Sequence, residues 1–126
     1  MIRNTAVPGG IYTILWSNAF TPSAGDSLPP YCIVDDGRAG SPLTVWLAAY
    51  TGGTDVMTIN IQRLVGSDLV DILSSDLSLP AGQSVAVYSR NFITPRPSFV
   101  VGDFLVPVIR SVNGQQAVTI GLSIQP

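Results

Sequence analysis

The segment 101–126 carries the pattern that most limits what this chain can fold into. Its last run alternates hydrophobic with small or polar residues, namely Val118, Ile120, Leu122 and Ile124 against Thr119, Gly121, Ser123 and Gln125. Because side chains alternate across a strand, this run predicts a strand with one buried face. Asn113-Gly114 predicts a tight hairpin turn that joins it to the apolar run 104–110. Such a hairpin is stable only when a second sheet covers it, so the segment predicts a β-sandwich.

The charged residues are few and of only two kinds. The charged fraction is 11%, all six cations are Arg, all eight anions are Asp, and Lys, Glu and His are absent. Lys and Glu are helix formers and the usual residues of a water-exposed surface, so their absence disfavours a helical protein. It also favours a surface covered by neighbouring subunits. A lineage with biased composition is the alternative explanation.

Net charge and hydropathy argue against two classes of partner. The formal net charge is −2, which gives no basic surface for nucleic acid. No apolar run reaches the roughly 18–20 residues that span a bilayer, so no membrane contact is expected. The first ten residues lack the apolar core of a signal peptide, which predicts a protein that is made and kept in a cytoplasm or is assembled there into something larger. Cys32 is the single cysteine, so no internal disulfide can form.

Short apolar runs separated by turn residues recur along the whole chain. They predict an all-β fold, a single antiparallel β-sandwich or jelly roll of about eight short strands, with helix nearly absent. Residues 1–10 are expected to form an extended N-terminal arm, and 11–126 the β-sandwich domain. The expected strands are 11–16, 31–34, 43–50, 56–64, 69–73, 85–88, 104–110 and 118–124.

Two of these strands have a predicted place in the sheet. The run 43–50 is apolar on both sides of Trp46 and should be central, and it should form a hairpin with 56–64 across Gly52-Gly53. The run 11–16 is expected to be buried on both faces. We also expect Trp16, Trp46 and Phe104 to lie in the core.

Pro107 interrupts the penultimate strand. Proline cannot donate to a sheet ladder, so this strand should be an edge at Pro107 or carry a bulge. Either device protects a sheet edge against unplanned pairing. Planned pairing with a strand of another subunit is the equally weighted alternative.

The residue types exclude most catalytic chemistry. Serine and cysteine nucleophiles need an imidazole base, and this chain has no His. A carboxylate pair could come from Asp35 and Asp36 or from Asp68 and Asp71, yet Asp-Asp-Gly is ordinary turn composition. We therefore expect no enzyme and no catalytic residues.

No cofactor and no metal are expected either. Asp26, Asp35 and Asp36 are loop carboxylates that could bind Ca²⁺, but loop aspartates of this kind more often form turns. Cys32 lies within an apolar run, where a lone cysteine is usually a small core residue.

The last 50 residues resemble a known pattern. Ser78-Leu79-Pro80-Ala81-Gly82-Gln83, the Gly102-Asp103 turn before Phe104-Leu105, and the alternating strand at 118–124 resemble small jelly-roll domains of tailed-phage virion proteins. Such domains occur in capsid decoration (cement) proteins, head fibres and tail-fibre tips, generally as trimers. The chain has no shaft repeat or coiled-coil segment before this domain, which favours a decoration protein over a fibre tip.

The resemblance implies a phage structural protein that decorates and stabilises the outer capsid surface. Its expected partners are the major capsid protein and two further copies in a homotrimer, and its expected location is the virion. We expect capsid contact through Ile2, Arg3 and Val7, and contact between copies through Phe99, Pro107 and Arg110. The alternative is a head- or tail-fibre tip that binds a host receptor or glycan, with Tyr50 and Phe92 as an exposed aromatic pair.

Overall fold

Over the residues that the structure describes, the chain folds into nine strands and one short 3-10 helix. A computed structural model describes residues 10–18 and 21–126; the arm expected at 1–10 lies almost wholly outside them. The strands are β1 (Tyr12–Asn18), β2 (Tyr31–Cys32), β3 (Ser41–Thr51), β4 (Met57–Val65), β5 (Asp68–Asp71), β6 (Leu77–Leu79), β7 (Val87–Ser89), β8 (Phe104–Ser111) and β9 (Gln116–Gln125), with the 3-10 helix at Asp36–Arg38. The all-β prediction is confirmed, and β6 is a strand beyond the eight that the sequence predicts.

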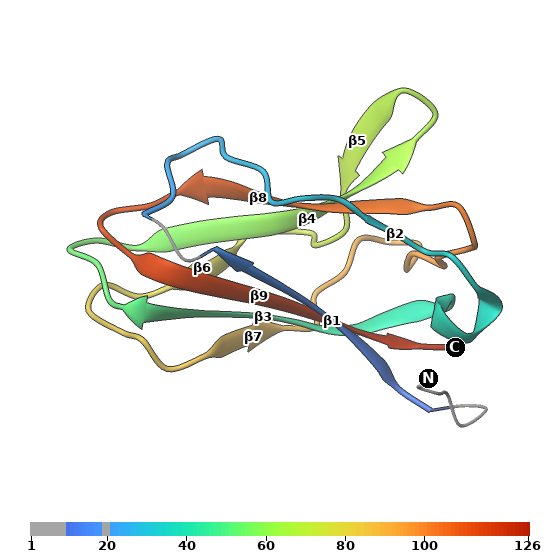
Figure 1. The fold of residues 1–126 in the computed structure, drawn as a ribbon, viewed down its shortest axis with the longest axis horizontal. Coiled ribbons are helices and arrows are strands. Elements are labelled where there is room, and N and C mark those ends of the chain that lie inside the picture. The colour runs from blue at the N-terminus through green and yellow to red at the C-terminus, as the bar shows by residue number, and fades with distance from the viewer. Residues whose placement is uncertain (1–9, 19–20) are drawn as a thin grey trace.

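The strands form two antiparallel sheets that face each other (Figure 1). One sheet has the order β1-β9-β3-β7, and the other has the order β2-β8-β4-β5 with β6 paired to β4. Most consecutive strands therefore lie in opposite sheets, which is the arrangement of a jelly roll. The predicted β-sandwich or jelly roll is confirmed.

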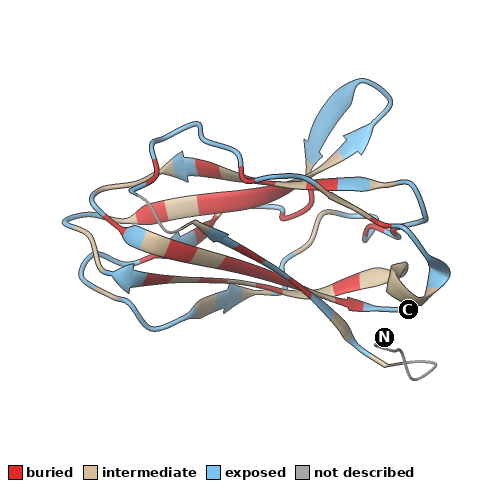
Figure 2. Ribbon diagram, viewed as in Figure 1, coloured by how far each residue is buried: buried red, intermediate tan, exposed pale blue. Residues whose placement is uncertain are grey.

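The core lies between the sheets, and buried residues alternate along the facing strands (Figure 2). Val118, Ile120, Leu122 and Ile124 of β9 are all fully buried, as their alternation predicts. They face a second fully buried set on the other sheet, made of Met57, Ile59, Ile61, Leu105 and Ile109. Burial of these side chains is the main stabilising contribution to the fold.

The two predicted hairpins are not hairpins. β8 and β9 lie in different sheets, and so do β3 and β4, so each pair is joined by an arch that crosses the core. Alternation shows that a strand has one buried face. It does not show whether two such strands are neighbours in one sheet or lie in opposite sheets with their buried faces toward each other. Among the consecutive strands, β4 and β5 do pair directly.

The two arches bind each other at one end of the sandwich. The Thr54 N–H donates to the Asn113 carbonyl (2.8 Å), and the Asn113 amide donates to the Val56 carbonyl (2.8 Å). Gln115 is fully buried; its Nε2 donates to the Asp55 carbonyl (2.7 Å). Gly53 allows this contact, since a Cβ there would lie 2.4 Å from the Gln115 side chain. Asn113 thus acts in an inter-arch contact as well as in its own turn.

Three predictions about burial need correction. β1 is an edge strand with one buried face, and Leu15 is 59% exposed. Trp46 faces outward because Val45 and Leu47 occupy the inner face of β3. Phe104 is also exposed, at the start of β8. Trp16 is buried and β3 is internal in its sheet, both as predicted.

Pro107 lies in an internal strand that carries a bulge. The ladder between β4 and β8 shifts between Thr58 and Ile59, so Arg110 is the extra residue. The Pro107 carbonyl accepts from the Leu28 N–H (3.1 Å), so the nitrogen of Pro107 also points to that side, away from β4. The nitrogen of Pro107 therefore faces an irregular segment and not a regular strand. The strand carries a bulge, but at Arg110 and in the ladder with β4, three residues from Pro107.

Candidate interaction surfaces

The residues predicted to make contacts are placed very differently by the fold. Ile2, Arg3 and Val7 lie outside the described residues. Phe99 and Pro107 are buried inside the sandwich of the single chain, whereas Arg110 is exposed on β8. Contact of these residues with a capsid or with other copies stays a prediction.

The aspartates are spread over separate turns. Asp35 lies 3.7 Å from the Arg38 guanidinium, Asp26 accepts from the Ser23 N–H (2.8 Å), and Asp68 and Asp71 occupy the two ends of β5. Within residues 10–18 and 21–126, no three His, Cys, Asp or Glu side chains come close enough to hold a metal ion. Cys32 is half-buried, with its sulfur 3.8 Å from the Ile33 carbonyl oxygen.

A hairpin of β4 and β5 projects from the sandwich (Figure 1). Leu64 pairs with Leu69 across it, and both are exposed, as are Val65 and Val70. Gly66 at the turn has a positive φ of 63°, as tight hairpin turns require. Aliphatic side chains at the tip of a projecting element favour contact with another protein.

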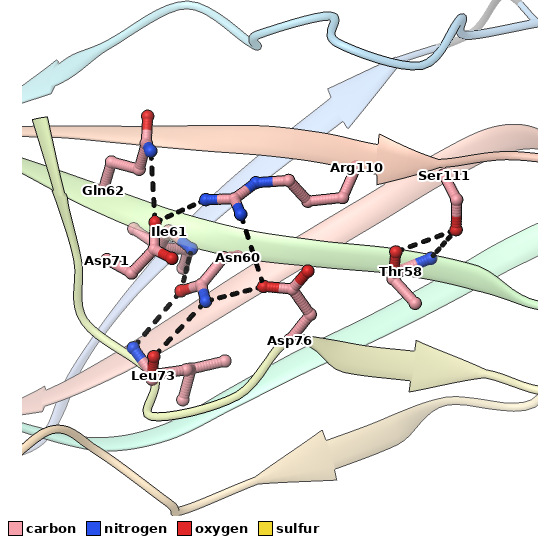
Figure 3. A network of polar contacts seen from close by, with 9 residues as sticks. All are labelled: Thr58, Asn60, Ile61, Gln62, Asp71, Leu73, Asp76, Arg110 and Ser111. Carbon is pink, nitrogen blue, oxygen red and sulfur yellow. Dashed lines mark hydrogen bonds and ion pairs between the residues drawn. The ribbon is translucent and has the colours of Figure 1, made fainter.

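Polar contacts hold the base of this hairpin to the sandwich (Figure 3). Asp71 accepts hydrogen bonds from Gln62 (3.1 Å) and from Arg110 of β8. Beside them, the buried Asn60 accepts from the N–H groups of Ile61 (2.8 Å) and Leu73 (3.2 Å) and donates to Asp76 (2.9 Å). The hairpin tip therefore projects from a fixed base.

A groove of about 350 Å³ runs between this hairpin and the loop that contains Ile93, Pro95 and Pro97. Arg63 forms part of its wall and pairs with Asp103 (2.8 Å), and its guanidinium also lies over the Phe99 ring, 5.6 Å from the centroid. These contacts fix Arg63 to the neighbouring turn. The groove is mostly apolar in its lining residues and continues the apolar surface of the hairpin.

The four strands of the β1-β9-β3-β7 sheet contain no charged residue, and their outer face carries a row that includes two aromatic side chains. Leu15, Gly121, Trp46 and Tyr88 are neighbours across the four strands. The Trp46 indole covers Gly121, because a Cβ at Gly121 would lie 2.2 Å from the indole Cε2. Tyr88 is 67% exposed at the end of the row. This face is thus partly aromatic, with an exposed ring at its β7 edge.

Two tyrosines join the sheets at their β1 and β2 edges. The hydroxyls of Tyr12 and Tyr31 are 3.0 Å apart, and Arg38 donates to the Tyr31 hydroxyl (3.0 Å). The Arg38 guanidinium lies 4.8 Å from the centroid of the Tyr12 ring. Burial and the hydrogen bond with Tyr31 raise the pKa of Tyr12 to about 12. The cluster acts as a structural clamp between the two sheets.

The structure separates one predicted pair and shows two surfaces that sequence reasoning missed. Tyr50 lies at the far end of β3, whereas Phe92 lies beyond the end of β7 that pairs near Val45, so they form no aromatic pair. Gly66-Ser67 between two apolar runs is a signal that could have found the β4–β5 hairpin. The outer aromatic row has no comparable signal, because it depends on the register of four strands.

Taken together, these features define a small jelly roll with exposed apolar and aromatic surfaces in the part of the chain that the structure describes. In that same part, no helix has the length and hydrophobicity needed to cross a membrane. No protein-family model matches the chain, and no curated protein matches its sequence.

Solved structures with this fold include chains from two phage capsids. A chain in the capsid of Ralstonia phage GP4 matches with a TM-score of 0.62 and 13% identity, over 100% of this chain and 91% of that one. A chain of the cyanophage Pam1 capsid matches with a TM-score of 0.56 and 13% identity, over 100% and 92%. A Podospora anserina GH26-CBM35 mannanase matches with a TM-score of 0.53 and 13% identity, over 94% of this chain and 28% of that one. At these identities the likeness concerns the fold.

Proposed function

We propose that this chain is a phage structural protein that decorates the outer surface of the capsid. The observation that supports it best is the end-to-end match with chains of two phage capsids, which are of similar length to this one. Because the match covers nearly all of both capsid chains, each of them consists of one jelly roll, as this chain does. A chain of this size fits a component that is added to the virion surface. The absence of His, Lys and Glu is consistent with a protein that acts by contact.

Attachment would be mechanical, through apolar contacts repeated on the capsid lattice. The exposed Leu64, Val65, Leu69 and Val70 of the projecting hairpin supply one apolar contact. The arm residues Ile2, Arg3 and Val7 would supply a second contact, to the major capsid protein. Many weak contacts on a lattice give strong collective attachment, which would be reinforced in a homotrimer.

Reconstitution on capsids tests this proposal. Capsids of the parent phage are prepared from a strain that lacks this gene, and the purified protein is added before sedimentation. We expect saturable binding at a fixed ratio to the major capsid protein, and capsids that resist heat better once they are decorated. Lack of binding, or absence of the protein from wild-type virions by mass spectrometry, would overturn the proposal.

A further inference from the structure

The arginines of the described chain fall into two groups. Arg38, Arg63 and Arg110 each lie within 4.0 Å of an aspartate carboxylate. Arg90 and Arg96 have no such partner among residues 10–18 and 21–126, and both line a groove of about 320 Å³ on the outer side of the β1-β9-β3-β7 sheet. Uncompensated guanidinium groups that line one groove favour an anionic ligand.

The two guanidinium groups are oriented by neutral partners. Arg90 donates from Nε to the Thr44 hydroxyl (3.2 Å) and lies over the Tyr88 ring, 5.6 Å from its centroid. Arg96 donates from Nε and Nη2 to the Pro42 carbonyl (3.0 and 2.6 Å). These contacts leave both terminal nitrogens of Arg90 and the Nη1 of Arg96 to donate to a ligand. A planar fork of this kind matches a carboxylate.

The sheet beneath the groove adds no negative charge to it. None of the four strands of this sheet contains an Asp or Arg. The remaining wall of the groove is formed by Ile11, Leu43 and the hydroxyl residues Thr44 and Ser123. No Asp is among the residues that line this groove, even though the protein as a whole is acidic.

The aromatic row lies next to the groove on the same face. Thr44 and Ser123 are paired across β3 and β9, and Trp46 and Gly121 are the next outward-facing pair along the same strands. Tyr88 pairs with Trp46 and also contacts Arg90. An exposed aromatic face beside hydroxyls is a surface on which a sugar ring can stack, since its C–H face is apolar and its rim is polar.

We propose that this groove binds an acidic saccharide, with the sugar carboxylate on Arg90 and Arg96 and a ring against Tyr88 and Trp46. The volume of the groove is at the small end of the range for small-ligand sites, about 300–1,000 Å³, which suits one sugar unit better than a protein surface. The inference does not depend on capsid attachment. Arg96 also lines the groove beside the projecting hairpin, whereas Arg90 lines this groove alone and is therefore the residue that the test uses.

Titration of the full chain with tetragalacturonate tests the site, with the fully methyl-esterified tetramer as the neutral control. We expect chemical-shift changes confined to the Arg90 and Trp46 region, saturable binding of the acid and at least ten-fold weaker binding of the ester. Arg90→Gln should weaken binding roughly ten- to hundred-fold, since a charge-assisted bidentate contact is lost. Higher salt should weaken it further.

Two further variants make the result specific. Tyr88→Ala removes an exposed ring and should weaken binding several-fold with an unchanged melting temperature. Arg110→Gln removes the same charge from the opposite sheet and should leave binding unchanged. Equal binding of acid and ester, or of Arg90→Gln and wild type, would overturn the proposal. So would loss of capsid binding in Arg90→Gln together with no response to the saccharide, because the groove would then contact protein.

Discussion

Asn60 shows how a single polar residue can be required inside an apolar core. It is 1% exposed, and its side-chain amide contacts both the Leu73 backbone and the Asp76 carboxylate. A buried amide is tolerated only when its hydrogen bonds are satisfied. Here they are satisfied by the irregular segment between β5 and β6, so Asn60 fixes that segment against β4.

Asn60→Ala should lower the free energy of unfolding by roughly 2–4 kcal/mol, because the N–H of Leu73 and its neighbours would remain buried without acceptors. Urea unfolding measures the change. Asn91→Ala, at an exposed position, is the matched control and should change stability by less than about 0.5 kcal/mol. An Asn60→Ala protein as stable as this control would contradict the role of the network.

Tyr12 makes stability depend on alkaline pH. Its pKa is raised to about 12 by burial and by the hydrogen bond with Tyr31, whereas an unfolded tyrosine titrates near 10. The folded state therefore holds this proton more tightly. The resulting stabilisation is complete below pH 10 and is lost as pH rises toward 12.

We expect the free energy of unfolding to fall between pH 10 and pH 12, and to fall less in Tyr12→Phe, which has no proton to lose at this position. Urea unfolding at pH 8 and pH 11 measures the difference. Absorbance at 295 nm should show one tyrosine that titrates near 12 in the folded protein and is missing from Tyr12→Phe. The same fall with pH in both proteins would contradict the assignment.

At the scale of elements, the tip of the β4–β5 hairpin, residues 64–70, consists of exposed residues and contributes no buried side chain to the core. Leu64 and Leu69 form a cross-strand pair and are both exposed, so their replacement removes little buried area. Two exposed leucines that face each other at a projecting tip favour a contact with another protein.

The double substitution Leu64→Ser and Leu69→Ser should weaken capsid binding at least ten-fold while it shifts the melting temperature by only a few degrees. Co-sedimentation with undecorated capsids and calorimetry provide the two measurements. Val85→Ser is the control, because Val85 is 73% exposed outside the hairpin. Unchanged capsid binding in the double variant would exclude the hairpin as a contact.

At the scale of the whole molecule, the predicted trimer and the arm can be tested together. Light scattering should give a mass three times the 13.3 kDa of one chain. Deletion of residues 1–10 should abolish capsid binding and leave the sandwich folded, because the core residues all lie beyond the deletion. A monomer would contradict the trimer, and a truncated protein that still binds capsids would contradict the arm contact.

The sequence alone determined the class of fold and much of the core. Alternation identified the buried face of β9 residue by residue, since period-two patterning is a local property that burial imposes directly. That Pro107 lies where β8 lacks a regular neighbouring strand on the side of its nitrogen also has a local cause, the missing N–H. Turn residues marked most of the boundaries between strands.

Only the tertiary structure decided which strands pair and which residues meet on the surface. Asn113-Gly114 and Gly52-Gly53 predicted hairpins, yet both connections cross the core. Alternation shows which face of a strand is buried, but not whether the next strand pairs with it in the same sheet or lies in the opposite sheet. Trp46 lies outside the predicted core because its two chain neighbours, Val45 and Leu47, occupy the inner face of β3. Arg90 and Thr44, distant in the sequence, meet in one groove through the pairing of β3 with β7. Such long-range pairing is set by the packing of the whole chain, which no local pattern records.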